Sequence, residues 1–327
     1  MNTKLYDAIT GFVCGDACGV PDEFKMRDSF KCTDMRASSM TDAHLVLPLG
    51  SWSDDTSMML CVLHALTEKQ EAETLERPPM NAYMSERLDA HIRNRVYATF
   101  KRDAIAWMTT GKYTNHGYRI PYDIGNSCRR GITAMMLGRT NDSANSVNSN
   151  GNGGLMRILP LAFTGMEDEE TLMKYIKLLN KDSHNHEISH IGCLIYTKLV
   201  QFLQIPDISL QEALQRTVDS ISNQYKISEY ARIWDLSILN EERKYVKSTG
   251  YVVDTLEAAI WSCAQCDNYK DAVLTAVNLG EDTDTVAALA GGLAGVYFGN
   301  VPEQWIKNTR RVGFLRKMCD KFEKGEP

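Results

Sequence analysis

The sequence predicts an all-α fold, a compact single-domain helical bundle that spans residues 1–327. Apolar residues recur at helical spacing in one segment after another, whereas no series of alternating strands is visible. Only 9 of the 327 residues are proline, and several of these stand between the periodic segments. No internal repeat of roughly 20–50 residues is visible, so we expect one domain and not an array.

The strongest helical patterns are residues 57–66, 172–179 and 286–297, where apolar side chains fall at i, i+3, i+4 and i+7. Each of these patterns places one apolar stripe on one helix face. Weaker patterns predict further helices at 3–14, 82–110, 125–138, 188–204, 208–222, 254–265, 268–279 and 302–322.

Three polar segments separate these helices. Residues 25–52 and 223–250 contain few periodic positions, and the charged segment 223–250 is expected at the surface. Residues 139–154 are rich in Asn, Ser and Gly. A polar loop of this length inside a compact domain is either a linker or a functional loop.

Charge and hydropathy argue against two kinds of partner. The chain has 36 Lys and Arg against 42 Asp and Glu, a net charge of −6, and no basic run, so nucleic acid is not an expected partner. The longest weakly polar run, residues 286–299, is shorter than the ~20 residues of a membrane span. Asp7 and Asp16 interrupt any apolar signal core at the N-terminus. We therefore expect a cytoplasmic protein without a membrane partner.

The nine cysteines have no disulfide-framework spacing, which favours reduced, packed thiols. Cys263 and Cys266 form a single CxxC pair, and a zinc or redox role for this pair is the alternative.

Two acidic clusters stand directly before helices. Asp54 and Asp55 precede the pattern at 57–66, and residues 281–285, with three acids, precede the pattern at 286–297. Acidic and hydroxyl side chains cap helices and complement the helix dipole, so capping is one interpretation. Adjacent carboxylates also repel one another, and a divalent cation removes this repulsion. Oxygen ligands of this kind suit Mg²⁺ or Mn²⁺ better than zinc.

A glycine-rich loop, residues 151–154, is expected to open a helical stretch that continues through 155–159. Small residues at such a position let backbone N–H groups approach an anion such as a pyrophosphate. An ordinary flexible turn fits the same residues.

Histidines cluster before the helix predicted from Ile188. His184 and His186 either bind a metal or belong to a capped helix start with surface histidines. His190 and Cys193 would lie side by side on one helix without a third group to orient them, which argues against a Cys–His hydrolase.

Taken together and in order, these segments resemble the ADP-ribosylglycohydrolase family, which includes the dinitrogenase reductase-activating glycohydrolases and the ADP-ribosyl-arginine hydrolases. The similar motifs extend over nearly the whole chain. They are residues 15–24, 52–56, 123–126, 151–157 with Pro160 and Leu161, 183–184, 278–285 and 290–295.

The resemblance implies a helical bundle of the ADP-ribosylglycohydrolase type with two Mg²⁺ or Mn²⁺ ions. The matched metal positions are Ser53, Asp54, Asp55, Asp282, Asp284 and Thr285. The matched acidic residues beside the metals and the substrate, from which the catalytic acid and base would come, are Glu23, Asp55 and Asp123. The positions that would hold ADP-ribose are Asn150, Gly151, Asn152, Gly153, Gly154, Met156, Arg157 and His184.

The implied reaction is the hydrolytic removal of ADP-ribose from an ADP-ribosylated protein, with arginine as the expected acceptor. A serine, nucleic-acid or small-molecule linkage is an alternative within the same class. A second alternative is an immunity protein that binds an ADP-ribosyltransferase toxin as well as reversing its product. An inactive relative is disfavoured, because every matched metal position keeps an oxygen ligand. Segments 25–50 and 67–91 depart from the family pattern beside the site, and this leaves the acceptor open.

Overall fold

The computed structural model describes residues 3–38, 46–75, 82–117 and 119–325, and within them the chain is helical. The α-helices are α1 (Thr3–Gly19), α2 (Asp54–Leu75), α3 (Ala82–Thr110), α4 (Asn126–Leu137), α5 (Glu169–Asn180), α6 (Glu187–Leu203), α7 (Leu210–Ser220), α8 (Ala231–Trp234), α9 (Val252–Ala264), α10 (Tyr269–Val277), α11 (Thr283–Tyr297), α12 (Glu303–Asn308) and α13 (Val312–Lys324). No strand occurs in these residues, apart from one isolated antiparallel bridge between Gly151 and Tyr251. The all-α prediction is confirmed.

Three local predictions differ from the structure. The stretch expected at 302–322 is two helices, α12 and α13, separated by a turn in which Arg310 has a φ of 62°. Residues 155–159 form no α-helix: a short 3₁₀ turn at Asn152–Gly154 precedes them, and a second one, Leu159–Phe163, begins at the last of them. Pro160 explains part of this result, because proline disfavours the α conformation in the residue before it.

The segment 223–250 is not confined to the surface. It forms a series of short turns with α8 and buries Tyr230, Ile233 and Ile238. Most buried apolar side chains of the described residues belong to one continuous cluster, to which these three contribute. Within the described part of the chain, none of the helices has both the length and the apolar character required to cross a bilayer.

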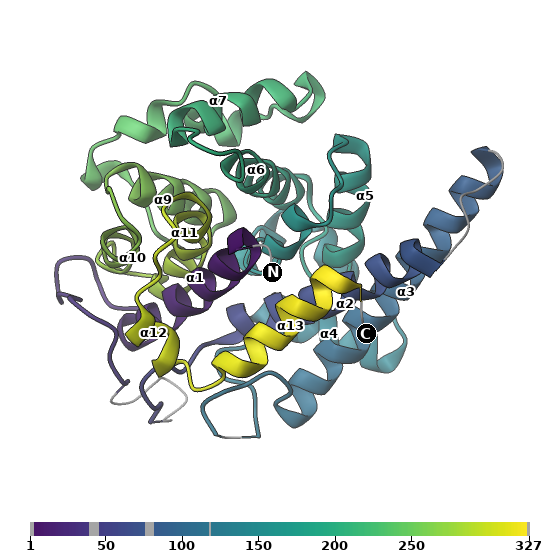
Figure 1. Ribbon diagram of the computed structural model, residues 1–327, viewed down its shortest axis with the longest axis horizontal. Helices are drawn as coiled ribbons and strands as arrows, with labels where there is room; N and C mark the ends of the chain where they lie inside the picture. Colours follow the sequence, from purple (N-terminus) through teal and green to yellow (C-terminus); the bar gives the residue numbers. More distant parts are fainter. Residues whose placement is uncertain (1–2, 39–45, 76–81, 118, 326–327) are drawn as a thin grey trace.

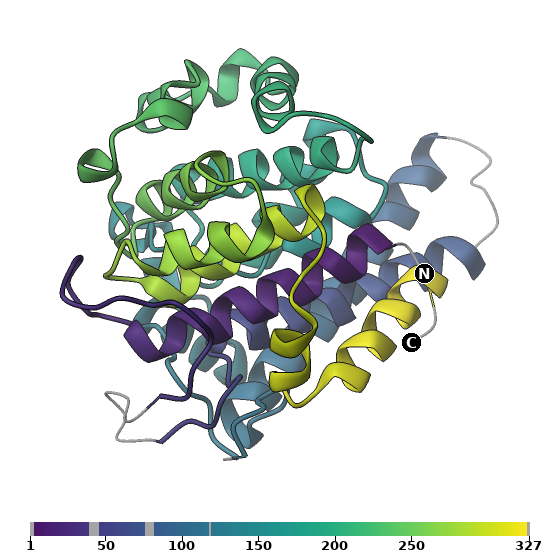
Figure 2. The same cartoon turned by 60° about the vertical axis from the view of Figure 1, so that its left-hand side comes forward.

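Helices α1 and α11 lie side by side at the centre of this core (Figure 1). Their backbones touch at glycines: a Cβ atom built on Gly15 would lie 2.0 Å from the carbonyl oxygen of Ala287, and one on Gly291 would lie 2.3 Å from that of Gly11. The two helices run antiparallel, because Gly19 at the end of α1 accepts a hydrogen bond of 2.8 Å from Thr283 Oγ1 at the start of α11. Figure 2 shows the purple helix α1 between the yellow-green helix α11 on one side and the yellow helix α13 on the other.

The start of α2 is attached to the same end of α1 by a buried carboxylate. Asp16 Oδ1 accepts a hydrogen bond from the Ser53 N–H at 2.9 Å. Asp16 Oδ2 accepts two more, from the Thr56 N–H at 3.0 Å and from Thr56 Oγ1 at 2.6 Å. The end of α1 and the starts of α2 and α11 therefore meet in one place.

Candidate active site

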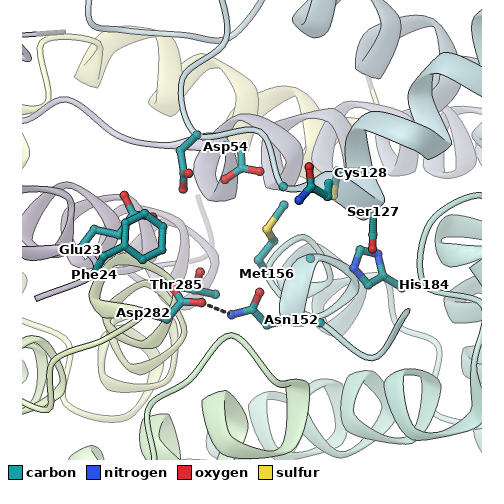
Figure 3. A pocket seen from close by; sticks show the side chains of 15 residues that line it. Glu23, Phe24, Asp54, Ser127, Cys128, Asn152, Met156, His184, Asp282 and Thr285 are labelled. Carbon is teal, nitrogen blue, oxygen red and sulfur yellow. Dashed lines mark hydrogen bonds between the residues drawn. The ribbon is translucent and has the colours of Figure 1, made fainter. Parts of the chain in front are cut away.

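A pocket of about 250 Å³ opens where these three helix ends meet (Figure 3). Its walls come from segments far apart in the sequence. They are Glu23, Phe24, Asp54, Asp123, Gly125, Asn126, Ser127, Cys128, Gly151, Asn152, Gly153, Met156, His184, Asp282 and Thr285. Figure 3 shows Glu23, Phe24 and Asp282 at one end of this pocket and Ser127 and His184 at the other.

Carboxylates crowd the first end. One oxygen each from Asp16, Asp55 and Asp284 can lie within 4.8 Å of the others, and the same holds for Glu23, Asp123 and Asp284. Asp284 belongs to both groups and so joins them. Asp54 and Asp282 line the pocket beside them.

The surroundings of these carboxylates oppose their ionisation. Burial is the main cause that raises the pKa values of Asp54, Asp55 and Asp284 well above their ordinary range, and neighbouring carboxylates raise them further. Burial, followed by the charge of Asp123, raises the pKa of Glu23 to about 10.

Two of the buried carboxylate oxygens have no hydrogen-bond donor. They are Asp55 Oδ2 and Asp284 Oδ2, each unpaired among the described residues. An unpaired buried oxygen beside like charges is costly, and a hard divalent cation satisfies both needs. The donor set, carboxylates with the Thr285 hydroxyl, fits Mg²⁺ or Mn²⁺.

The glycine-rich loop is joined to this acidic end. Asn152 Nδ2 donates to Asp282 Oδ2 at 2.8 Å, drawn as a dashed line in Figure 3, and to Thr255 Oγ1 at 3.0 Å. Asn152 N–H also donates to the Gly250 carbonyl at 2.9 Å. These bonds hold the Asp282 carboxylate and the loop in one fixed relation.

His184 stands at the opposite end and is buried, which rules out the alternative of a surface histidine for this residue. Burial and the nearby Arg157 charge lower its pKa well below the ordinary range, so the imidazole is neutral. His186 instead caps α6 through Nδ1. Among the described residues, no group of three potential metal ligands includes a histidine.

Six of the predicted site residues do not line the pocket: Ser53, Asp55, Asn150, Gly154, Arg157 and Asp284. Asp55 and Asp284 nevertheless belong to the carboxylate groups described above. Arg157 is buried behind the wall, where its Nε donates to the Gly153 carbonyl at 2.6 Å and its Nη2 donates to Ser183 Oγ at 3.0 Å. Arg157 therefore fixes the loop and the His184 turn from behind. Asn150 Oδ1 accepts from the Ser189 N–H at 3.2 Å and secures the start of α6.

Beyond the pocket lining, Asp16 and Tyr122 contribute to the site, and the sequence prediction gives neither of them a role. Asp16 is the one charged residue in the apolar stretch 8–20, and a lone acid in such a helix is a signal of a buried polar contact. Tyr122 donates from its hydroxyl to Glu23 Oε2 at 2.8 Å. Nothing in the local sequence distinguishes Tyr122 from any other loop tyrosine.

The comparisons with known proteins first place this chain among the glycohydrolases, enzymes that hydrolyse glycosidic bonds. The family model that matches is ADP-ribosylglycohydrolase, over residues 2–326. The chain belongs to the ADP-ribosylglycohydrolase family, and the predicted resemblance is confirmed.

Similar proteins include ADP-ribosylarginine hydrolase Tri1 of Pseudomonas putida (strain GB-1), 28% identical over 96% of this chain and 76% of that protein. The ADP-ribosyl-[dinitrogen reductase] glycohydrolase of Rhodospirillum rubrum is 26% identical over 94% of this chain and 90% of that protein. A solved structure of an "ADP-ribosylglycohydrolase-related protein complex" matches with a TM-score of 0.69 at 20% identity, over 99% of this chain and 98% of that chain. This last similarity supports the fold alone.

Proposed function

We propose that the protein is a metal-dependent ADP-ribosylarginine hydrolase, which releases ADP-ribose from arginine side chains of proteins. The observation that carries this proposal is the paired acidic helix start: Asp55 and Asp284, 229 positions apart in the chain, lie together with unpaired buried oxygens. The names of the similar hydrolases from Pseudomonas putida and Serratia proteamaculans support arginine as the acceptor.

Two Mg²⁺ or Mn²⁺ ions would be held by the two helix starts. The residues proposed to hold them are Ser53, Asp54, Asp55, Asp282, Asp284 and Thr285. When bound, such ions orient sugar hydroxyls and polarise a water molecule. Asp16 supports this arrangement from outside, because its three hydrogen bonds fix the first turn of α2, which carries Asp54 and Asp55.

Glu23, Asp55 and Asp123 are the proposed acid–base groups. Cleavage of a glycosidic bond passes through a positively charged, oxocarbenium-like transition state, which nearby carboxylates stabilise. A proton must also reach the departing acceptor or leave the attacking water. Glu23 lines the pocket and is oriented by the Tyr122 hydroxyl, so its carboxyl is held where either transfer would occur.

The ADP-ribose diphosphate would lie against the glycine-rich loop, where backbone N–H groups are available to an anion. We expect Gly153→Val to weaken ADP-ribose binding more than tenfold, because one lost hydrogen bond to a charged group costs about 1.5–3 kcal/mol. The added Cβ would lie 2.7 Å from His184 Cε1. Isothermal titration calorimetry with ADP-ribose measures the effect.

The control is Gly313→Val in α13, which does not line the pocket. Its Cβ would meet no atom within 4 Å. Gly313→Val should keep wild-type affinity, and both variants should keep the wild-type circular dichroism spectrum. Equal affinity of Gly153→Val and wild type would show that the loop is only a connector.

The activity itself is tested with defined linkages. The protein is incubated with an arginine-linked and a serine-linked ADP-ribosyl peptide, with Mg²⁺ or Mn²⁺ or with chelator, and free ADP-ribose is measured. We expect release from the arginine-linked peptide only, and only with metal. Release from serine, or release in chelator, would contradict the corresponding half of the proposal.

A toxin partner and a cytoplasmic location remain predictions. Segments 25–50 and 67–91, which flank the site in sequence, extend into residues 39–45 and 76–81, which lie outside the described part of the chain. Binding to an ADP-ribosyltransferase is tested separately, with a variant that has lost turnover.

A further inference from the structure

Phe24 is an aromatic side chain that the fold leaves uncovered at the mouth of the pocket. It follows Glu23 directly, lines the pocket and is 63% exposed. Figure 3 shows it beside Glu23 and near Asp282, at the end opposite His184. A large apolar side chain gains nothing from this position in the isolated protein, since burial is what stabilises such a group.

The backbone that presents this ring is also unfavourable. Phe24 has a φ of 63°, in the left-handed region that residues other than glycine rarely adopt. The conformation is maintained by a contact with the start of α11: the Phe24 N–H donates to the Glu281 carbonyl at 2.7 Å, and the Glu281 N–H donates to the Lys25 carbonyl at 2.8 Å. Strain that the surrounding structure holds in place is concentrated at functional sites.

The positively charged side chain next to Phe24 contacts other groups and not the Phe24 ring. Lys25, the next residue, donates to Asp22 Oδ1 at 2.8 Å, and its Nζ lies 5.7 Å from the ring centre of Phe30. Across the described ranges, no cation–aromatic contact involves Phe24. The face of this ring is therefore accessible beside an acidic pocket end, where a positively charged ligand group is favoured twice, by the carboxylates and by the aromatic face.

We propose that Phe24 is a specificity-determining residue whose ring packs against the guanidinium group of the acceptor arginine. This inference rests on the function proposed above and extends it to the leaving group. The ring stands next to Glu23, where a proton would be exchanged with the acceptor, and at the far end of the pocket from His184. It therefore contacts the acceptor and not the ADP part of the substrate.

The decisive variant is Phe24→Leu, which keeps an apolar side chain of similar size and removes the aromatic face. A cation–aromatic contact contributes about 0.5–2 kcal/mol, so kcat/KM for an arginine-linked ADP-ribosyl peptide should fall roughly 2- to 30-fold, mainly through KM. Phe24→Tyr should restore it. The affinity for free ADP-ribose, which lacks the acceptor, should be unchanged in both variants.

The matched control is Met26→Ala, in the same segment. Met26 is 74% exposed and does not line the pocket, so the kinetics of the Met26→Ala variant should equal those of the wild type. Leucine and tyrosine have the same backbone strain as phenylalanine at this position, so neither substitution should change the stability of the fold. Thermal melting of every variant checks this.

Failure of the proposed Phe24 contact and failure of the proposed function give different results. If wild type cleaves the arginine-linked peptide and Phe24→Leu does so equally well, the contact is refuted while the proposed function stands. The contact is refuted also if Phe24→Leu weakens free ADP-ribose binding as much as it lowers kcat/KM. If wild type leaves the arginine-linked peptide intact, the proposed function fails and this contact fails with it.

Discussion

Asp55→Ala should abolish turnover while leaving the metal-free fold intact. Asp55 is buried against Asp16 and Asp284, and its Oδ2 has no donor among the described residues. Bound metal contributes several kcal/mol to the transition state, and each ~1.4 kcal/mol is a factor of ten, so we expect release of ADP-ribose to fall by about three orders of magnitude. The melting temperature without metal should stay the same or rise, because the substitution relieves like-charge repulsion.

Three measurements on one sample separate these effects: the melting temperature without metal, its increase with Mg²⁺ or Mn²⁺, and the release of ADP-ribose. The metal-dependent increase should disappear in Asp55→Ala, since a ligand stabilises a protein only through binding its folded state. Thr67→Ala is the control, because Thr67 is buried in the same helix and, among the described residues, its hydroxyl bonds only to the Leu63 carbonyl, at 3.0 Å. The proposed metal site would be falsified by an Asp55→Ala variant that keeps wild-type turnover and whose melting temperature still rises when metal is added.

Gly15→Ala should clearly destabilise the protein. The new Cβ would lie 2.0 Å from the Ala287 carbonyl oxygen, a backbone atom that cannot turn aside. Helices α1 and α11 would have to separate, and overpacking of this kind costs about 1–3 kcal/mol or more. Because the entropy of unfolding grows with chain length, we expect the melting temperature of this chain to fall by roughly 1.5–5 °C.

The same separation would disturb the site, because the end of α1 leads to Glu23 and the start of α11 carries Asp284. Metal-dependent stabilisation and turnover should therefore both decline in Gly15→Ala. Gly313→Ala is the matched control: its Cβ would meet no atom within 4 Å, and alanine favours a helix more than glycine does. Equal melting temperatures of Gly15→Ala and wild type would contradict the close packing of α1 and α11.

Much of the fold was predictable because its signals are local. Helical periodicity depends on residues three and four positions apart, so the apolar stripes at 57–66, 172–179 and 286–297 predicted α2, α5 and α11 correctly. The acidic residues before α2 and α11 were also recognisable, since a helix start is defined within a few positions. Repulsion between neighbouring carboxylates was enough to suggest a cation there.

Whether these two helix starts meet depends on contacts that no local pattern describes. Asp55 and Asp284 come together because the glycine contacts of α1 bring in α11 and the Asp16 carboxylate brings in α2. Burial of His184 and the role of Arg157 behind the glycine loop depend in the same way on packing between distant segments. The residues that are close along the chain determine the helices and their charged ends, whereas distances across the core, and therefore the assembled pocket, are decided only when the helices pack.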